Sequence, residues 1–208
     1  MRKARYKKGL TLIELLLALM ITVIITAAVA TLSSALNSVN AATEDTSQKQ
    51  AQVRFTALRI SDLVRNCKLI CFAGPDDFAV WRADDIYNDG QINIGELVYI
   101  ETGPVHDHLR ICEFPSLDST AINLSIIDTL ATNWWSFYSG SVNYIEVIPQ
   151  CSNVQFSIDV LPPQSRFVTI SFDVVENGLA RQYQINAKLR GWAGNLLDGS
   201  GNIVIDDD

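Results

Sequence analysis

The chain has 208 residues, of which 48% are apolar and 19% charged, and this composition excludes a disordered or low-complexity protein. The formal net charge of −7 is unevenly distributed. Residues 1–9 carry five positive charges and no acid, residues 10–66 are balanced, and residues 67–208 carry a net charge of −12. So acidic a C-terminal part argues against nucleic acid as a partner, because phosphate neutralisation needs a basic surface.

A long apolar segment follows the basic residues. Residues 10–36 include 20 apolar side chains, and Glu14 is the only charged residue between Leu10 and Thr43. As a helix, this segment spans about 40 Å, which is enough to cross a bilayer once. Positive charges precede it and none directly follows. We therefore expect a single-pass protein of the cytoplasmic (inner) membrane, with a cytoplasmic N-terminus and an extracytoplasmic body.

Three other interpretations explain less of this segment. A cleaved secretory signal has an apolar core of about 7–15 residues before small residues, which Ala28 and Ala30 mimic. An ordinary anchor fits the length but leaves Glu14 unexplained, because a carboxylate in hydrocarbon costs about 2.5–3.5 kcal/mol, and less near the interface. A buried helix of a soluble protein is disfavoured by the length of the apolar run behind a basic N-terminus.

Residues 7–15 read Lys-Lys-Gly-Leu-Thr-Leu-Ile-Glu-Leu. This string resembles the cleavage and methylation motif of type IV prepilins and type II secretion pseudopilins. The resemblance implies that prepilin peptidase removes residues 1–9 by cutting after Gly9, and that Leu10 is then methylated. Glu14 would be the fifth mature residue, the signature acid of the family. Leu10 departs from the phenylalanine that usually comes first after the cut.

The chemistry of Glu14 suggests a role in assembly. A carboxylate held in lipid needs a positive partner or must be neutralised. Cleavage after Gly9 creates a cationic α-amino group at Leu10, which Glu14 of a neighbouring subunit can meet in a helical bundle. We therefore expect other pilin or pseudopilin subunits, and membrane lipid, to be the partners of residues 10–36.

The rest of the chain predicts an α+β fold. Residues 37–66 contain no Pro or Gly and place apolar side chains at helical spacing, so one helix is expected from about Leu10 to about Asn66. Its second half, residues 37–66, is amphipathic and is expected to pack on an antiparallel sheet. This arrangement agrees with the pilin fold that the resemblance implies.

The body, residues 67–208, is rich in strand-like segments. The dipeptide Asn177-Gly178 is a strong hairpin signal between the last two of them. Residues 118–140, which include Trp134-Trp135, predict either a short helix or an irregular excursion; the tryptophans would serve as a docking surface or lie buried. The predicted strands cover residues 78–82, 96–101, 109–114, 154–160, 167–175 and 181–189.

Residues 85–96 resemble the twelve-residue calcium loop of EF-hands. The loop requires oxygen ligands at fixed positions and a glycine at position 6, where this chain has Gly90. Tyr87 breaks the pattern, and strands are expected on both sides in place of helices. The alternative is an acidic turn that only shapes a hairpin. The candidate ligands for calcium are Asp85, Asp89, the Gln91 carbonyl, Asn93 and Glu96.

The chain contains four cysteines, namely Cys67, Cys71, Cys112 and Cys151. An extracytoplasmic body permits disulfides, so at least one is expected, but the sequence does not decide between the three pairings. Cys67 and Cys71 are four residues apart near the end of the expected helix, where they would share a face. Zinc is the rival interpretation, although the spacing matches no zinc module.

No nucleophile elbow, phosphate loop or catalytic triad is present in the sequence, so we expect a protein that is not an enzyme. The favoured interpretation is a minor pilin or pseudopilin subunit, in a type IV pilus or a type II secretion pseudopilus. The length and the strand-rich body look most like the larger minor subunits, the J-type pseudopilins or W-type minor pilins. The alternative is a membrane-anchored extracytoplasmic domain that binds calcium or another ligand and does not enter a filament. A secreted hydrolase is the third interpretation, but no site for it is visible.

Overall fold

The computed structural model describes residues 11–82, 91–117, 119–127, 138 and 140–191. These residues form two compact units, residues 1–46 and residues 47–208, which are described separately. One helix, α1 (Leu12–Asn66), runs through the boundary between the units. The expected helix from about Leu10 to about Asn66 is therefore confirmed.

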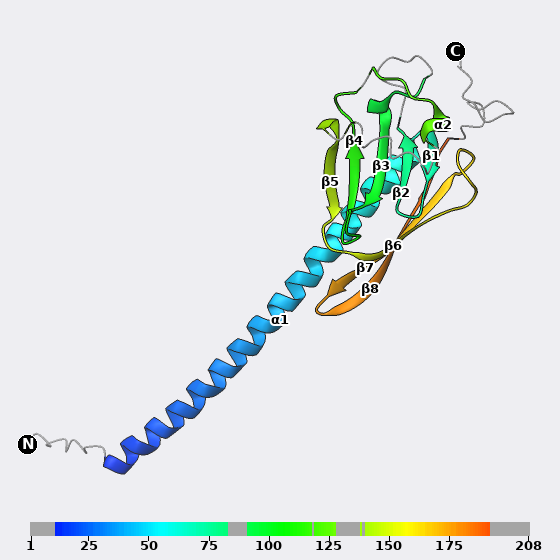
Figure 1. Ribbon diagram of the computed structural model, residues 1–208. Helices are drawn as coiled ribbons and strands as arrows, with labels where there is room; N and C mark the ends of the chain where they lie inside the picture. The colour runs from blue at the N-terminus through cyan, green and yellow to red at the C-terminus, as the bar shows by residue number, and fades with distance from the viewer. Residues whose placement is uncertain (1–10, 83–90, 118, 128–137, 139, 192–208) are drawn as a thin grey trace, which may run out of the picture. The chain divides into compact units, whose positions relative to one another are not determined.

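Apart from Thr11, the described part of the first unit is α-helical and belongs to α1 (Figure 1). Its apolar side chains are exposed on every side, and its most apolar window has a mean hydropathy of 2.7 with no residue covered by this chain. Helical residues satisfy their backbone hydrogen bonds internally, which is what a bilayer demands. Length and composition thus make α1 able to cross a membrane.

The second unit contains two antiparallel sheets, where the sequence suggested one. Strand neighbours in the first sheet follow the chain order β1-β2-β3-β4-β5, and in the second the order β6-β7-β8. The strands of the first sheet are β1 (Leu69–Ala73), β2 (Asp77–Trp81), β3 (Leu97–Thr102), β4 (Leu109–Glu113) and β5 (Asn143–Ile148). The strands of the second are β6 (Ser152–Ile158), β7 (Phe167–Glu176) and β8 (Leu179–Lys188). The two remaining elements are the 3₁₀ helix η1 (Ile94–Glu96) and the short helix α2 (Leu124–Ile127).

All six predicted strands are present, and β1 and β5 were not predicted. The Asn177-Gly178 turn is confirmed: both residues have positive φ, 51° and 79°, as a two-residue type I′ hairpin requires. The fold is α+β, with a long N-terminal helix and antiparallel sheets, and is consistent with the pilin fold.

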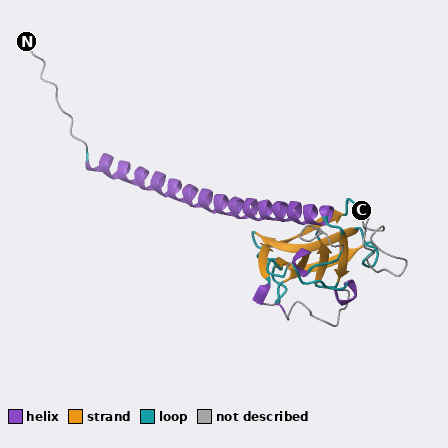
Figure 2. Cartoon of the chain, turned by 90° about the horizontal axis from the view of Figure 1, so that it is seen from above, coloured by secondary structure: helices purple, strands orange, loops and turns teal. Residues whose placement is uncertain are grey.

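The first sheet separates two apolar cores, because its central strands alternate between them. Phe78 and Val80 of β2 point into the first core, whereas Ala79 and Trp81 point into the second. The first core also receives the inner face of β6–β8 and the last turns of α1, which lie alongside the strands (Figure 2). The second core is completed by η1, α2 and nearby loop residues.

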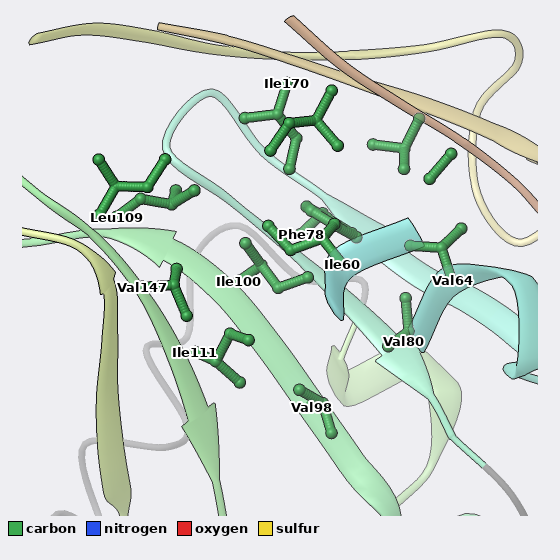
Figure 3. Close-up of a cluster of buried hydrophobic side chains, with 14 of the residues drawn as sticks. Ile60, Val64, Phe78, Val80, Val98, Ile100, Leu109, Ile111, Val147 and Ile170 are labelled. Carbon is green, nitrogen blue, oxygen red and sulfur yellow. The ribbon is translucent and has the colours of Figure 1, made fainter. Parts of the chain in front are cut away.

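The amphipathic half of α1 packs over a shorter stretch than its sequence predicts. Ile60 and Val64 are fully buried among Phe78, Ile100 and Ile170 in the first core (Figure 3). Val39 lies in the same predicted amphipathic segment, residues 37–66, yet its side chain is exposed. The buried residues of α1 therefore lie only between Val53 and Val64.

We expect the substitution Ile60→Ala to lower the free energy of unfolding by about 2–5 kcal/mol, because it leaves a cavity in a closed core. Leu58, two residues earlier, is 72% exposed, so Leu58→Ala provides a matched control with a change of about 0.5 kcal/mol or less. Urea unfolding of the full chain in detergent, followed by tryptophan fluorescence, measures both. Equal losses for the two variants would contradict the assignment of the buried face.

Candidate functional site

The N-terminal end of α1 is organised around Glu14. Its Oε2 atom accepts hydrogen bonds from the backbone N–H and the hydroxyl of Thr11, both at 2.9 Å. The backbone N–H of Glu14 in turn donates to Thr11 Oγ1 at 3.4 Å. Thr11 and Glu14 thus form a capping box, which satisfies donors that the first turn of a helix leaves unpaired. The sequence pattern Thr-x-x-Glu predicts this contact, which our sequence analysis missed.

The Oε1 atom of Glu14 has no hydrogen-bond partner among the residues that the structure describes. The capping box therefore occupies one carboxylate oxygen and leaves the other for a second group. Gly9 and Leu10, the predicted processing residues, lie outside the described residues.

Hydroxyl groups farther along the apolar helix are satisfied within it. The side chains of Thr22 and Thr26 donate to the carbonyls of Ala18 and Thr22, each at 2.7 Å. Such bonds to the preceding turn let a threonine lie in hydrocarbon without an unpaired donor. Glu14 is therefore the one ionisable side chain in the described apolar segment that calls for a partner outside its own helix.

The end of the calcium-like loop is well defined. η1 begins directly after Asn93, and the Glu96 carboxylate folds back to accept the backbone N–H of Asn93 at 3.2 Å. Glu96 Oε2 also accepts the indole N–H of Trp81 at 2.9 Å. This loop thus ends in a helical turn, as the loop of a helix–loop–helix calcium site does.

Glu96 is completely buried, and its Oε1 atom has no hydrogen-bond partner among the described residues. A buried carboxylate oxygen without a partner is costly, so it favours a cation or a donor nearby. Of the five candidate ligands, the structure describes Gln91, Asn93 and Glu96, whereas Asp85 and Asp89 lie outside the described residues. The described residues contain no group of three His, Cys, Asp or Glu side chains able to hold a metal ion.

The four cysteines are buried thiols and form no disulfide, so the expected disulfide is absent from the structure. α1 ends at Asn66, so Cys67 and Cys71 are not on one helical face. Cys71 points into the second core with Leu69, whereas Cys67 lies in the first core. The bulge at Cys71 places the next residue, Phe72, in the second core as well. The sheet therefore separates these two thiols.

The other pairings within a core fail for reasons of distance. Cys71 and Cys112 share the second core, but β2 and β3 lie between their strands, which places them about 14 Å apart. A disulfide requires Cα atoms within about 7 Å. Cys67 and Cys151 share the first core at opposite ends of the sheet: the residue after Cys67 bonds Trp81, whereas Cys151 bonds Asp107 in the β3–β4 loop.

Burial also makes these thiols unreactive. Loss of solvent raises the pKa of Cys67 to about 12 and that of Cys151 to about 11, and it raises the pKa of Cys112 as well. Thiolate is the form that attacks disulfides and binds metals, so such thiols are inert. The separation across the sheet likewise gives no support to a shared zinc site.

The sequence did not reveal a charged cluster in the first sheet. It lies at the end of the sheet that carries the turn between β1 and β2. Arg110 donates from Nε to Glu101 Oε1 at 2.7 Å and stacks over the ring of Tyr144 at 4.1 Å. Asp77 pairs with Glu101 in the β2–β3 register, which places the two carboxylates on neighbouring strands. Burial, followed by the charges of Glu101 and Asp76, raises the pKa of Asp77 to about 7.

Known protein families give one match, at the N-terminus. The family model described as the prokaryotic N-terminal methylation motif matches residues 4–30. A search of curated proteins and a search of solved structures each gave no match. The match supports the resemblance of the N-terminus to the prepilin cleavage and methylation motif. Together with the apolar helix, it supports anchoring in a membrane.

The pKa of Asp77 generates a prediction about stability. Because the folded state binds this proton more tightly than the unfolded chain, folding stability falls as pH rises from about 4 to about 7, and the effect is then constant. Asp77→Asn removes the penalty, so it should raise Tm at pH 8 and change it little at pH 4. Each kcal/mol of change in the free energy of unfolding shifts Tm by about 2–4 °C for a chain of this length.

Thermal unfolding of the full chain in detergent at both pH values measures this effect. The control is Glu44→Gln, which removes an exposed acid from α1. A gain in Tm for Asp77→Asn that is the same at pH 4 and pH 8 would show that the buried charge is not the cause.

Proposed function

We propose that this protein is a non-catalytic minor pilin or pseudopilin subunit. In this proposal prepilin peptidase cuts after Gly9, Leu10 is methylated, and α1 carries the subunit into a type IV pilus or a type II secretion pseudopilus. One observation carries the proposal: the methylation motif at residues 4–30 opens a helix whose apolar side chains no other part of the described chain covers.

The capping box at Glu14 suggests how the subunit recognises a neighbour. Thr11 orients the carboxylate at the start of α1 and occupies only one of its oxygens. The α-amino group of a neighbouring mature subunit would be the cation for the other oxygen. Such a pair fixes the axial register of two helices, because a shifted register leaves both charges unpaired in lipid.

The body supports a minor subunit in a tip or initiating complex. Two sheets and two cores make it a larger body than one helix on one sheet. We therefore favour the larger minor subunits, of the J-type or W-type, over a major subunit that repeats along the filament.

We expect Glu14→Ala to insert into the membrane normally and to lose co-assembly with other pilin-like subunits by at least tenfold. The measurement is recovery of partner pilins with the tagged chain from crosslinked membranes, alongside membrane fractionation. Glu14→Gln is the matched control: it keeps the capping hydrogen bonds, removes the charge, and should fail as Glu14→Ala does. If both variants co-assemble at the wild-type level, the charge of Glu14 does not set the register of the helices. If the unaltered chain itself recovers no partner pilin, the chain is an anchored domain outside a filament.

Calcium at residues 85–96 is a second proposal, and the buried unpartnered Oε1 of Glu96 is the observation that favours it. The Gln91 carbonyl, Asn93 and Glu96 would contribute from the described side of the loop, with Asp85 and Asp89 completing the site. The ion would order this surface of the body and would have no catalytic role.

Calcium at ten times its Kd should stabilise the full chain by about 1.4 kcal/mol. Tm should rise accordingly, by about 2–4 °C for each kcal/mol. The comparison is Tm in EDTA and in calcium, with magnesium as the control ion. Glu96→Gln should abolish the shift, whereas Glu113→Gln, on β4, should keep it. The same Tm in EDTA and calcium would leave the acidic hairpin loop as the correct interpretation.

A further inference from the structure

The outer edge of the second sheet is a long, regular strand. β8 pairs with β7 over all ten of its residues without a register shift. The Asn177-Gly178 turn makes the pair that flanks it a hydrogen-bonded one. Antiparallel ladders alternate from there, so the backbone N–H and C=O groups of every second residue, from Ala180 to Lys188, point away from β7.

Among the described residues, none pairs with the backbone of this edge. No backbone hydrogen bond joins residues 180–188 to any described residue outside β7. Inward side chains of β8 do pack in the first core, and Tyr183 has a side-chain hydrogen bond with Gln50 of α1. The edge of β5 differs, because Thr56 of α1 donates to the Val147 carbonyl at 2.8 Å. Proteins usually protect edges with proline, a bulge or an inward charge in the middle of the strand. β8 has no proline and no bulge, and its two charged residues lie near its ends.

We propose that β8 pairs with β8 of a second copy of this chain. The two strands run antiparallel about a two-fold axis at Gln184, and the two three-stranded sheets become one six-stranded sheet. Gln184 is the middle one of the five residues whose backbone groups point outward. This register is therefore the one that pairs all of them.

The charged residues of β8 are compatible with a second copy in this register. Arg181 and Lys188 are the charged residues of β8. The two-fold places Arg181 opposite Ala187 of the other copy, and Lys188 opposite Ala180. Like charges directly opposite each other would destabilise the pair, and this register avoids every such contact.

The uncharged residues of β8 are complementary to themselves as well. Gln182 faces Asn186 of the other copy and Gln184 faces its own equivalent, so each amide meets an amide that both donates and accepts. On the inner face, the half-buried Tyr183 meets Ile185, an aromatic and β-branched pair that stabilises cross-strand contacts. A single two-fold axis thus gives the charged, amide and apolar side chains of β8 compatible neighbours. A second copy therefore fits this edge better than an unrelated strand.

Cysteine crosslinking of the full chain in membranes tests this register. Directly opposite residues of a hydrogen-bonded pair have Cα atoms about 5.5 Å apart, within the range of a disulfide. Gln184→Cys should therefore give a disulfide-linked dimer, of twice the monomer mass, after mild oxidation with copper phenanthroline. Gln182→Cys is the control: its own equivalent lies four residues away along the strand, about 13 Å, which is too far. The double variant Gln182→Cys with Asn186→Cys should crosslink again. The unaltered chain, with its four buried thiols, sets the background.

A proline tests the role of the backbone. Gln182→Pro removes an outward N–H and keeps the ladder to β7, so it should reduce the crosslink through Gln184→Cys at least tenfold while the protease resistance of the body is unchanged. Equal crosslinking at positions 182 and 184 would overturn the proposal, and so would no dimer at either the 184 or the 182/186 pair. A crosslinked product of a mass other than twice the monomer would assign the edge to a different protein and would also overturn it. None of these outcomes depends on whether the chain enters a filament.

Discussion

The apolar half of α1 cannot remain exposed to water, and most of what the protein does follows from that constraint. Its side chains are uncovered on all sides, so lipid or the apolar helices of other subunits must surround it. The helix satisfies its backbone and its threonine hydroxyls internally. Glu14 is the exception, because its capping box engages one carboxylate oxygen and leaves a charge for an outside partner. A helix with a single such charge near one end can be held by lipid alone and then be fixed in register by a neighbour.

In the body, both faces of the first sheet are buried. The α1 residues from Val53 onward, together with the second sheet, cover the first face, and η1 and α2 cover the other. This arrangement explains why the strands β2 and β3 are buried along nearly their whole length. It also explains the cysteines, because the sheet divides them into two cores and keeps them apart.

Local signals in the sequence were sufficient for most of the elements. The long helix, the Asn177-Gly178 hairpin and six strands could be predicted, because each rests on periodicity or turn chemistry within a short window. β1 was missed because both of its faces are buried and a bulge at Cys71 interrupts any alternation. β5 does alternate, with Ile145 and Val147 on one face and Tyr144 and Glu146 on the other, and was detectable. The division into two sheets was not predictable, since it depends on pairings between distant strands.

The candidate site shows the same division. The Thr11–Glu14 capping box is a local pattern and could have been found, whereas the burial of Glu96 under Trp81 depends on strand pairing. The prediction that Cys67 and Cys71 share a face was wrong, because α1 ends at Asn66 and the two side chains enter different cores. The charge cluster around Asp77, Glu101 and Arg110 is created by neighbouring strands and leaves no trace in a single stretch of sequence.

The most direct test of the account is the chemical identity of the mature N-terminus. Mass spectrometry of the protein purified from native membranes should find a chain that begins at N-methylated Leu10, and the free amine required by Glu14 would then exist. A chain that still begins at Met1 would contradict processing and assembly, and would leave an anchored extracytoplasmic domain.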